Sequence, residues 1–424
     1  MSETITPSIP AVSNTFEIKI IEAEKTALKN GVPVYFVNAG TQDIVRLEIY
    51  FDAGIIRQQK PFQAFLTNLM LIEGTTNRSS AQISEDIDFY GGYLSVDYAK
   101  DFASLTLHIL NKYFDKGLEV IKDILQNANF PQNELDTMIA NQKSAYMVDV
   151  EKVSYVAQKK LNELMFKGHP YGTASTADDF NKISREDILA FYKYYNLSFA
   201  QITLSGKIEQ KEIDLLDKYL GIIPVSAKEK SPFPASFSFD AGKHFVEKKD
   251  AMQSAIKVGG HLPFKGTQDF YGLLVLNTIF GGYFGSRLMN NIREDKGWTY
   301  GISSYIESTA IDSCLIISTE VKGDIAEKAL AEIFVEMDKL STELVAEDEL
   351  EKVRTYMLGK FLKNLDGPFE VCDRFWGIQQ FGLGYEYYHQ YIKTIKTISA
   401  EELQRLAKKY FDKDKLVCLI AGIR

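Results

Sequence analysis

An arginine and a tyrosine near one helix-to-strand turn are the residues of this sequence best suited to chemistry. Arg293 and Tyr300 lie within the segment Gly281 to Tyr305, which reads GGYFGSRLMNNIREDKGWTYGISSY and predicts a glycine turn, an amphipathic helix and a short strand. A guanidinium and a phenol are both hydrogen-bond donors at neutral pH, so together they could hold a substrate carbonyl or the oxyanion that forms from it. The alternative is a surface arginine beside a half-buried strand tyrosine.

The elements around this segment follow a pattern that occurs twice along the chain. Asn30-Gly31 separates two apolar runs and predicts a hairpin. Apolar and polar residues alternate from Val45 to Gly54, which predicts a strand with one buried face. The first half then predicts helices at 63–72, 84–90, 114–125, 133–147, 153–166 and 184–194, and strands at 93–98, 104–110 and 200–205. The second half repeats this order, with strands at 254–260, 299–305 and 313–320 and helices at 271–280, 325–337 and 347–361.

Landmarks that recur in one order at a nearly constant offset indicate an internal duplication. We therefore predict an α+β protein of two similar domains, each an antiparallel-rich sheet with helices packed on one face. Residues 1–15 are rich in Ser, Thr and Pro and predict a loose lead-in, and 226–236 (SAKEKSPFPAS) has the composition of a linker. The expected domains are 16–225 and 237–424, in keeping with a length of 424 residues.

Composition restricts the classes of partner. The net charge of -9 and pI near 5.3 argue against nucleic acid, because phosphate binding calls for a basic patch. The sequence has no uninterrupted apolar run long enough to span a bilayer, and its N-terminus does not read as a secretory signal, so we expect no membrane association and a cytoplasmic location. The three cysteines share no short spacing, which favours reduced, packed thiols.

The order of parts resembles the M16 peptidase family, the insulinase and pitrilysin group that includes the mitochondrial processing peptidases. The segment SRLMNNIREDKGWTYGISSY is similar to the family's Ser-Arg-Leu, Arg-Glu-x-Lys-Gly and Tyr pattern, and EGTTNRSSAQISEDIDFYGGYLSVD is similar to the segment that follows its zinc helix. His169-Pro170-Tyr171-Gly172 also resembles a recurring family turn. The resemblance covers nearly the whole chain and implies two domains of the M16 α/β roll type.

Zinc-bearing members of that family carry His-x-x-Glu-His on the first-half helix, where two histidines ligate the metal and the glutamate takes a proton from bound water. The matching positions here are Phe65, Asn68 and Leu69. The family's third ligand falls near Ala145, and no two of the five histidines lie within one helical turn. We therefore expect this chain to bind no metal, and the resemblance places zinc in a partner subunit.

The resemblance also assigns roles to the second half. Arg293 and Tyr300 match the pair that closes on the substrate from the facing unit, where Arg293 holds the peptide carbonyl and Tyr300 donates to the oxyanion. Gly281, Gly282 and Gly285 are similar to a glycine-rich loop near the substrate in non-zinc subunits, although a plain turn that allows close packing is an equal alternative.

Two functions stay open from the sequence. The first is a non-zinc subunit of a two-chain M16 metallopeptidase, inactive alone, that forms a heterodimer with a zinc-bearing chain and acts on unfolded peptides, which add as a strand to a sheet edge. The second is a catalytically inert M16-like scaffold or peptide-binding protein, in which Arg293 and Tyr300 have only packing roles. The sequence does not decide whether the isolated chain forms a homodimer.

Overall fold

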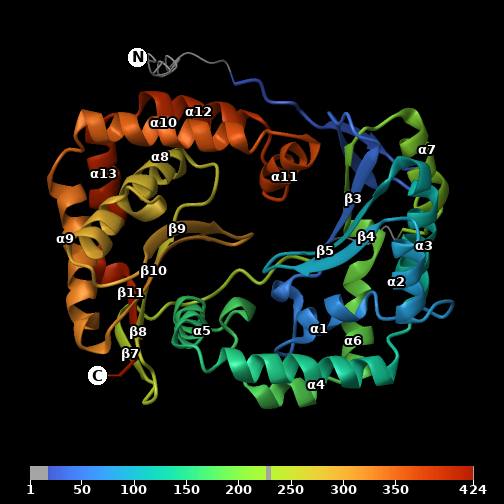
Figure 1. The fold of residues 1–424 in the computed structure, drawn as a ribbon, viewed down its shortest axis with the longest axis horizontal. Helices are drawn as coiled ribbons and strands as arrows, with labels where there is room; N and C mark the ends of the chain where they lie inside the picture. Colours follow the sequence, from blue (N-terminus) through green and yellow to red (C-terminus); the bar gives the residue numbers. More distant parts are fainter. Residues whose placement is uncertain (1–17, 226–230, 424) are drawn as a thin grey trace, which may run out of the picture.

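The computed structural model describes residues 18–225 and 231–423. The predicted lead-in at 1–15 and residues 226–230 of the predicted linker lie outside these ranges. Two sheets organise the described chain, one in each half (Figure 1). The first has the order β1-β2-β6-β3-β5-β4, made of Glu24–Ala27, Pro33–Asn38, Gln201–Gly206, Ile44–Phe51, Ala103–Leu110 and Tyr93–Tyr98. The second has the order β7-β11-β8-β10-β9, made of Gly242–Glu247, Val417–Gly422, Ser254–Leu262, Ser313–Val321 and Ile302–Ser308.

The two sheets match strand for strand, apart from the extra β1. Each sheet contains one parallel pair, β2 with β6 in the first and β7 with β11 in the second. The next strand in each sheet, β3 or β8, is antiparallel to both of its neighbours. The outer strands β4 and β9 then pair antiparallel with β5 and β10. This equivalence confirms the predicted fold of two similar α+β domains that arose by duplication.

Helices of each half cover one face of its own sheet. The first half contributes α1 to α7, at Gln63–Met70, Ser80–Asp88, Phe114–Asn127, Gln132–Asp149, Val153–Met165, Arg185–Tyr192 and Gln210–Tyr219. The second contributes α8 to α13, at Gln268–Asn277, Ala326–Thr342, Glu347–Lys363, Pro368–Gln379, Glu386–Thr397 and Ala400–Tyr410. The predicted helical stripe from Phe114 is buried against Leu47 and Ile49, as the spacing requires.

One helix of each half crosses to the other half's sheet (Figure 1). Helix α5 packs Ala157 and Leu161 against Leu419 of β11 and its neighbours on the second sheet. In return, α11 packs on β2 and β6 of the first sheet. Its Trp376 ring stacks on Tyr50, with the ring centroids 3.6 Å apart. This exchange covers the second face of both sheets, which the sequence pattern did not predict.

The prediction that β3 has one buried face was wrong for this reason. Arg46 and Glu48 are only 8% and 9% exposed, because α11 lies over them. The buried charge of Arg46 is balanced by two carboxylates. Its Nη2 donates to Asp373 Oδ1 of α11 at 2.5 Å and lies 3.0 Å from Glu48 Oε2. Burial raises the pKa of Glu48, and the Arg46 charge opposes that rise.

No helix in the described residues combines the length and the apolar character needed to cross a bilayer. Cys314, Cys372 and Cys418 are buried free thiols, as expected from their spacing.

Candidate functional site

The side chain of Arg293 contacts the backbone of Tyr300. The Arg293 Nε donates to the Tyr300 carbonyl oxygen at 3.0 Å, and its Nη1 pairs with Glu294. The guanidinium carbon also lies 4.7 Å from the centroid of the Phe284 ring. The Tyr300 side chain itself is 94% exposed and points away from the chain. Arg293 therefore fixes the loop that carries Tyr300, and the phenol is left free to meet another molecule.

The local sequence explains how the loop reaches this shape. Met289–Asp295 forms a π-helical turn, a geometry that often occurs at functional sites. Gly297 ends it with a φ of +62°, a conformation that favours glycine, and its N–H donates to the Arg293 carbonyl at 3.1 Å. The chain then enters β9 at Ile302, so Tyr300 stands at the start of an outer strand.

A second arginine attaches the π-helical turn to the domain. Arg287 donates from Nε and Nη2 to the two carboxylate oxygens of Glu349 on α10, at 2.9 and 2.8 Å. Such bidentate pairs fix orientation as well as adding stability. Sequence reasoning recognised Arg287 only as part of a motif, because its partner lies 62 positions away.

The three glycines of the segment lie in different surroundings. Gly281 is buried, and a Cβ there would stand 2.5 Å from Ser304 Oγ and 2.9 Å from its backbone nitrogen, so the residue allows close packing on β9. Gly282 lines a cavity beside β9, and Gly285 is exposed next to Phe284. The close-packing alternative thus accounts for Gly281, and a substrate contact stays a prediction for the other two.

The α1 helix does not fit a zinc ion. Phe65 and Leu69 are half-buried, and the Phe65 ring packs 5.0 Å from the Tyr98 ring. Asn68 is fully buried beside Tyr195, where burial raises the pKa of the phenol and the Asn68 amide opposes part of that rise. Two of the three positions therefore offer no ligand atom, and the third faces the protein interior.

One group of three side chains elsewhere has metal-ligand types close together. His261 of β8, Cys314 of β10 and Asp312, which immediately precedes β10, place their ligand atoms within 4.8 Å of one another. They are already bonded: Asp312 Oδ2 accepts from His261 Nδ1 and from Cys314 Sγ, the latter at 3.2 Å. Burial, followed by the Asp312 charge, raises the pKa of the Cys314 thiol. The sequence did not reveal this group, because the strand register brings it together.

Comparisons with known proteins fit these observations. The model of the insulinase family, peptidase family M16, matches residues 34–179, and the model of the peptidase M16 inactive domain matches residues 182–357. An uncharacterized zinc protease, YmxG, of Bacillus subtilis strain 168 is 24% identical over 93% of this chain and 97% of its own length. A protein of Helicobacter pylori named non-peptidase homolog YmxG is 25% identical over 68% of each chain.

A solved structure shares the fold. The peptidase M16 inactive domain from Pseudomonas fluorescens matches with a TM-score of 0.83 and 20% sequence identity, covering 95% of this chain and 98% of that one.

Proposed function

Since this chain belongs to the M16 peptidase family, we propose that it is a non-zinc subunit of a two-chain peptidase. In this proposal a zinc-bearing M16 chain supplies the metal, and this chain supplies contacts to the substrate and to the transition state. The support comes from the contrast between the two halves. The α1 helix lacks ligand types at Phe65 and Leu69, whereas the loop that ends at Tyr300 keeps its donors.

The exposure of Tyr300 is the observation that carries the proposal. A tyrosine that is 94% exposed contributes little to folding, yet here an arginine holds its backbone in place. Phe284, which lies under that arginine, is 66% exposed. Arginine and aromatic residues that are exposed together are typical of surfaces that bind a partner.

The chemistry assigned to this chain follows from its donors. When a peptide carbonyl is attacked, negative charge develops on its oxygen, and the Tyr300 phenol would donate a hydrogen bond to it. Arg293 would hold the loop through Nε, while Nη2, which makes no hydrogen bond to the described residues, could reach the peptide carbonyl. Loss of one such donor typically lowers kcat by roughly 10² to 10³.

Reconstitution tests the proposal. The tagged chain is purified from its native host, and bound proteins are searched for a chain that carries His-x-x-Glu-His. The two chains are then produced separately and mixed with a fluorogenic peptide. We expect hydrolysis only in the mixture, together with a heterodimer in sedimentation. Stoichiometric zinc and peptide hydrolysis in the chain alone would contradict the proposal.

Tyr300→Phe is the first variant to compare in that mixture. We expect kcat to fall on the order of 10²-fold with assembly unchanged, because only the hydroxyl is removed. Tyr93→Phe is the matched control, since Tyr93 is also exposed, at 64%, on the outer strand of the first sheet. Equal activity of both variants and the wild type would favour the inert alternative.

That alternative is a scaffold or peptide-binding protein without catalytic role. It is favoured by the name of the Helicobacter relative, a non-peptidase homolog, and by the hydrogen bond that already occupies Arg293 within its own chain. It predicts that the chain binds peptides or a partner and that no mixture shows activity dependent on Tyr300. A homodimer with the same properties would also belong to this alternative.

A further inference from the structure

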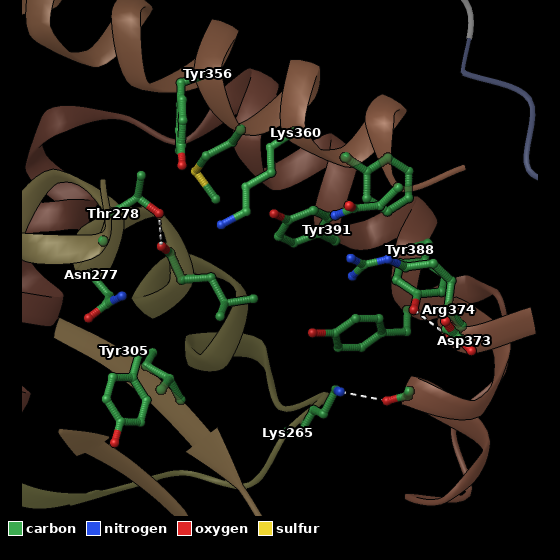
Figure 2. A pocket seen from close by; sticks show the side chains of 18 of the residues that line it. Lys265, Asn277, Thr278, Tyr305, Tyr356, Lys360, Asp373, Arg374, Tyr388 and Tyr391 are labelled. Atoms are coloured by element: carbon green, nitrogen blue, oxygen red, sulfur yellow. Dashed lines mark hydrogen bonds between the residues drawn. The ribbon is translucent and has the colours of Figure 1, made fainter. Parts of the chain in front are cut away.

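A cavity of about 460 Å³ lies in the second domain beside β9 (Figure 2). Helices α8, α10, α11 and α12 and the loop before α8 contribute its walls. Its volume is within the range of sites that bind small molecules or the end of a peptide. The cavity is separate from Arg293 and Tyr300, neither of which lines it.

Positive charge gathers in this cavity although the protein as a whole is acidic. Lys265, Lys360 and Arg374 approach it from three different elements (Figure 2). Its lining contains one carboxylate, that of Asp373, and this group is already paired with Arg46 on the first sheet. Arg374 forms no ion pair with any of the described residues. The three cations therefore lack a balancing charge within the cavity.

The surroundings hold the Lys265 ammonium in place. Lys265 Nζ donates to the Gly377 carbonyl at 2.6 Å and lies 4.6 Å from the centroid of the Phe381 ring. Burial, and then the charge of Arg374, lower the pKa of Lys265 to about 8. Both effects disfavour the charged form of Lys265, and a bound negative charge would favour it.

Tyrosine hydroxyls complete the cavity. Tyr387, Tyr388 and Tyr391 of α12 line it, and the charge of Arg374 acts on all three. Burial nevertheless raises the pKa of Tyr388 and Tyr391 to about 12. These phenols stay protonated at neutral pH; the Tyr388 hydroxyl already donates to the Arg374 carbonyl at 2.6 Å, which leaves Tyr387 and Tyr391 to donate to a ligand. A guanidinium, two ammonium groups and several phenols form a set of donors suited to a carboxylate.

The position of the cavity indicates how that carboxylate would arrive. Ser304, Tyr305 and Ile306 of β9 form one wall. Among the described strands β9 pairs only with β10, so no strand covers its other edge, although α8 and the π-helical turn Thr278–Gly282 lie against part of it. Asn277 Nδ2 donates to the Ser304 carbonyl at 3.2 Å, so that carbonyl is already occupied. The part of the edge that remains for a peptide backbone runs from Tyr305 to Ser308.

We propose that this cavity binds a carboxylate of a peptide that lies along β9, through Arg374, Lys360 and Lys265. The inference rests on the proposed function, because it assumes that peptides are the ligands of this chain. The carboxylate could be the C-terminus of the peptide or an Asp or Glu side chain. Both have the same chemistry, and the experiment separates them.

The test measures binding of four fluorescein-labelled peptides to the chain by anisotropy at low ionic strength. The first has a free C-terminal carboxylate, the second a C-terminal amide, and the third and fourth are amides with one internal Glu or Gln. We expect the acid to bind about tenfold more tightly than the amide, as for a hydrogen-bonded ion pair. Tight binding of the Glu amide, but not of the Gln amide, would assign the side chain as the source.

Variants locate the effect. Arg374→Gln and Lys360→Met should each remove most of the preference for the acid and leave amide binding unchanged. Arg374→Lys should retain part of it. Lys328→Met removes one exposed charge from α9, outside the cavity, and should behave as wild type. Far-UV circular dichroism checks that each variant is folded.

Two results would overturn the inference. One is equal binding, or no binding, of all four peptides by the wild type. The other is a preference for the acid that persists in both Arg374→Gln and Lys360→Met, which would place the carboxylate elsewhere. Neither result decides the proposed function, because hydrolysis in the mixture of the two chains is measured independently.

Discussion

At the scale of single residues, Arg293 is informative because it contacts the residue on which the proposed chemistry depends. Its Nε holds the Tyr300 carbonyl, and its guanidinium lies over Phe284. It can therefore support catalysis by positioning the tyrosine, by contacting the substrate, or by both. A geometry in which one residue orients another predicts non-additive effects of their substitutions.

We predict that Arg293→Ala and Tyr300→Phe lower kcat in the reconstituted pair and that the double variant loses less than the product of the two single losses. Arg293 positions Tyr300, so in a chain that already lacks the Tyr300 hydroxyl the further loss of Arg293 should lower kcat less than it does in the wild type. KM should change little in both. Arg293→Lys should not restore kcat, because lysine cannot donate to the Tyr300 carbonyl while packing on Phe284. Independent, multiplicative losses would instead assign Arg293 a separate substrate contact.

Lys265 predicts a pH dependence of carboxylate binding. Its pKa is lowered to about 8, and a bound carboxylate favours the charged form. Below about pH 8 the ammonium is already present, so affinity is constant. Above it binding must take up a proton, so the Kd of the acid peptide should rise with pH, by no more than about tenfold in all, which is the whole preference for the acid.

Other groups facing Lys265 do not produce this profile. Arg374 carries a permanent charge, and Asp373 is paired with Arg46. Burial keeps the pKa of Tyr305, Tyr387, Tyr388 and Tyr391 above its usual range. Lys360 of α10 faces the same cavity, so a variant of Lys265 is needed to separate the two lysines. Lys265→Arg should flatten the profile between about pH 7 and about pH 9.5. A profile that survives in this variant would exclude Lys265 as its source.

At the scale of elements, the close approach of α5 to β8 is the contact that joins one half to the sheet of the other. Gly259 makes it possible, because a Cβ there would stand 2.2 Å from Met165 Sδ and 3.1 Å from Leu161 Cδ1. Met165 is only 1% exposed, so its side chain can move aside only by displacing other buried side chains.

We therefore predict that Gly259→Ala lowers the free energy of unfolding by about 1 to 3 kcal/mol through overpacking. Chemical denaturation followed by circular dichroism measures it. Gly359→Ala on α10 is the control: an added Cβ meets nothing within 4 Å there, and alanine favours a helix, so stability should rise by about 0.5 to 1 kcal/mol. Unchanged stability of Gly259→Ala would show that α5 shifts at little cost.

The elements also show what the sequence could predict. Local signals located most strands and helices, and Gly31 has the positive φ of 86° that the Asn-Gly pair implied, but the strands β7 and β11 and the helices α7 and α11 to α13 were not predicted. The helix at Gln63–Met70 was predicted because its apolar run and the glycine that follows it are local signals. The exchange of α5 and α11 was missed, since the contacts that fix it, such as Arg46 to Asp373, join residues 327 positions apart. The cavity beside β9 was missed for the same reason.

At the scale of the whole molecule, the helix exchange makes each half part of the other's core. The loop between β4 and β5 strengthens the joint: Lys100 pairs with Glu307 at 2.7 Å, and Asp101 accepts from the Ala310 backbone at 2.9 Å. Neither sheet can lose its own helices or its neighbour's without exposing apolar surface. Two duplicated domains linked only by a connector could unfold separately, whereas these should unfold together.

The two tryptophans of the chain make this prediction measurable. Trp376 of α11 stacks on Tyr50 and reports on the first sheet, and Trp298 packs against the core of the second domain. Each of the variants Trp298→Phe and Trp376→Phe keeps one tryptophan. The fluorescence of that tryptophan should change in denaturant with the same midpoint as the far-UV circular dichroism of the same variant. Comparing two probes within one variant removes any effect of the substitution on stability itself. A fluorescence midpoint that departs from the circular dichroism midpoint, in either variant, would mean that one half unfolds alone and that the exchanged helices detach before the sheets do.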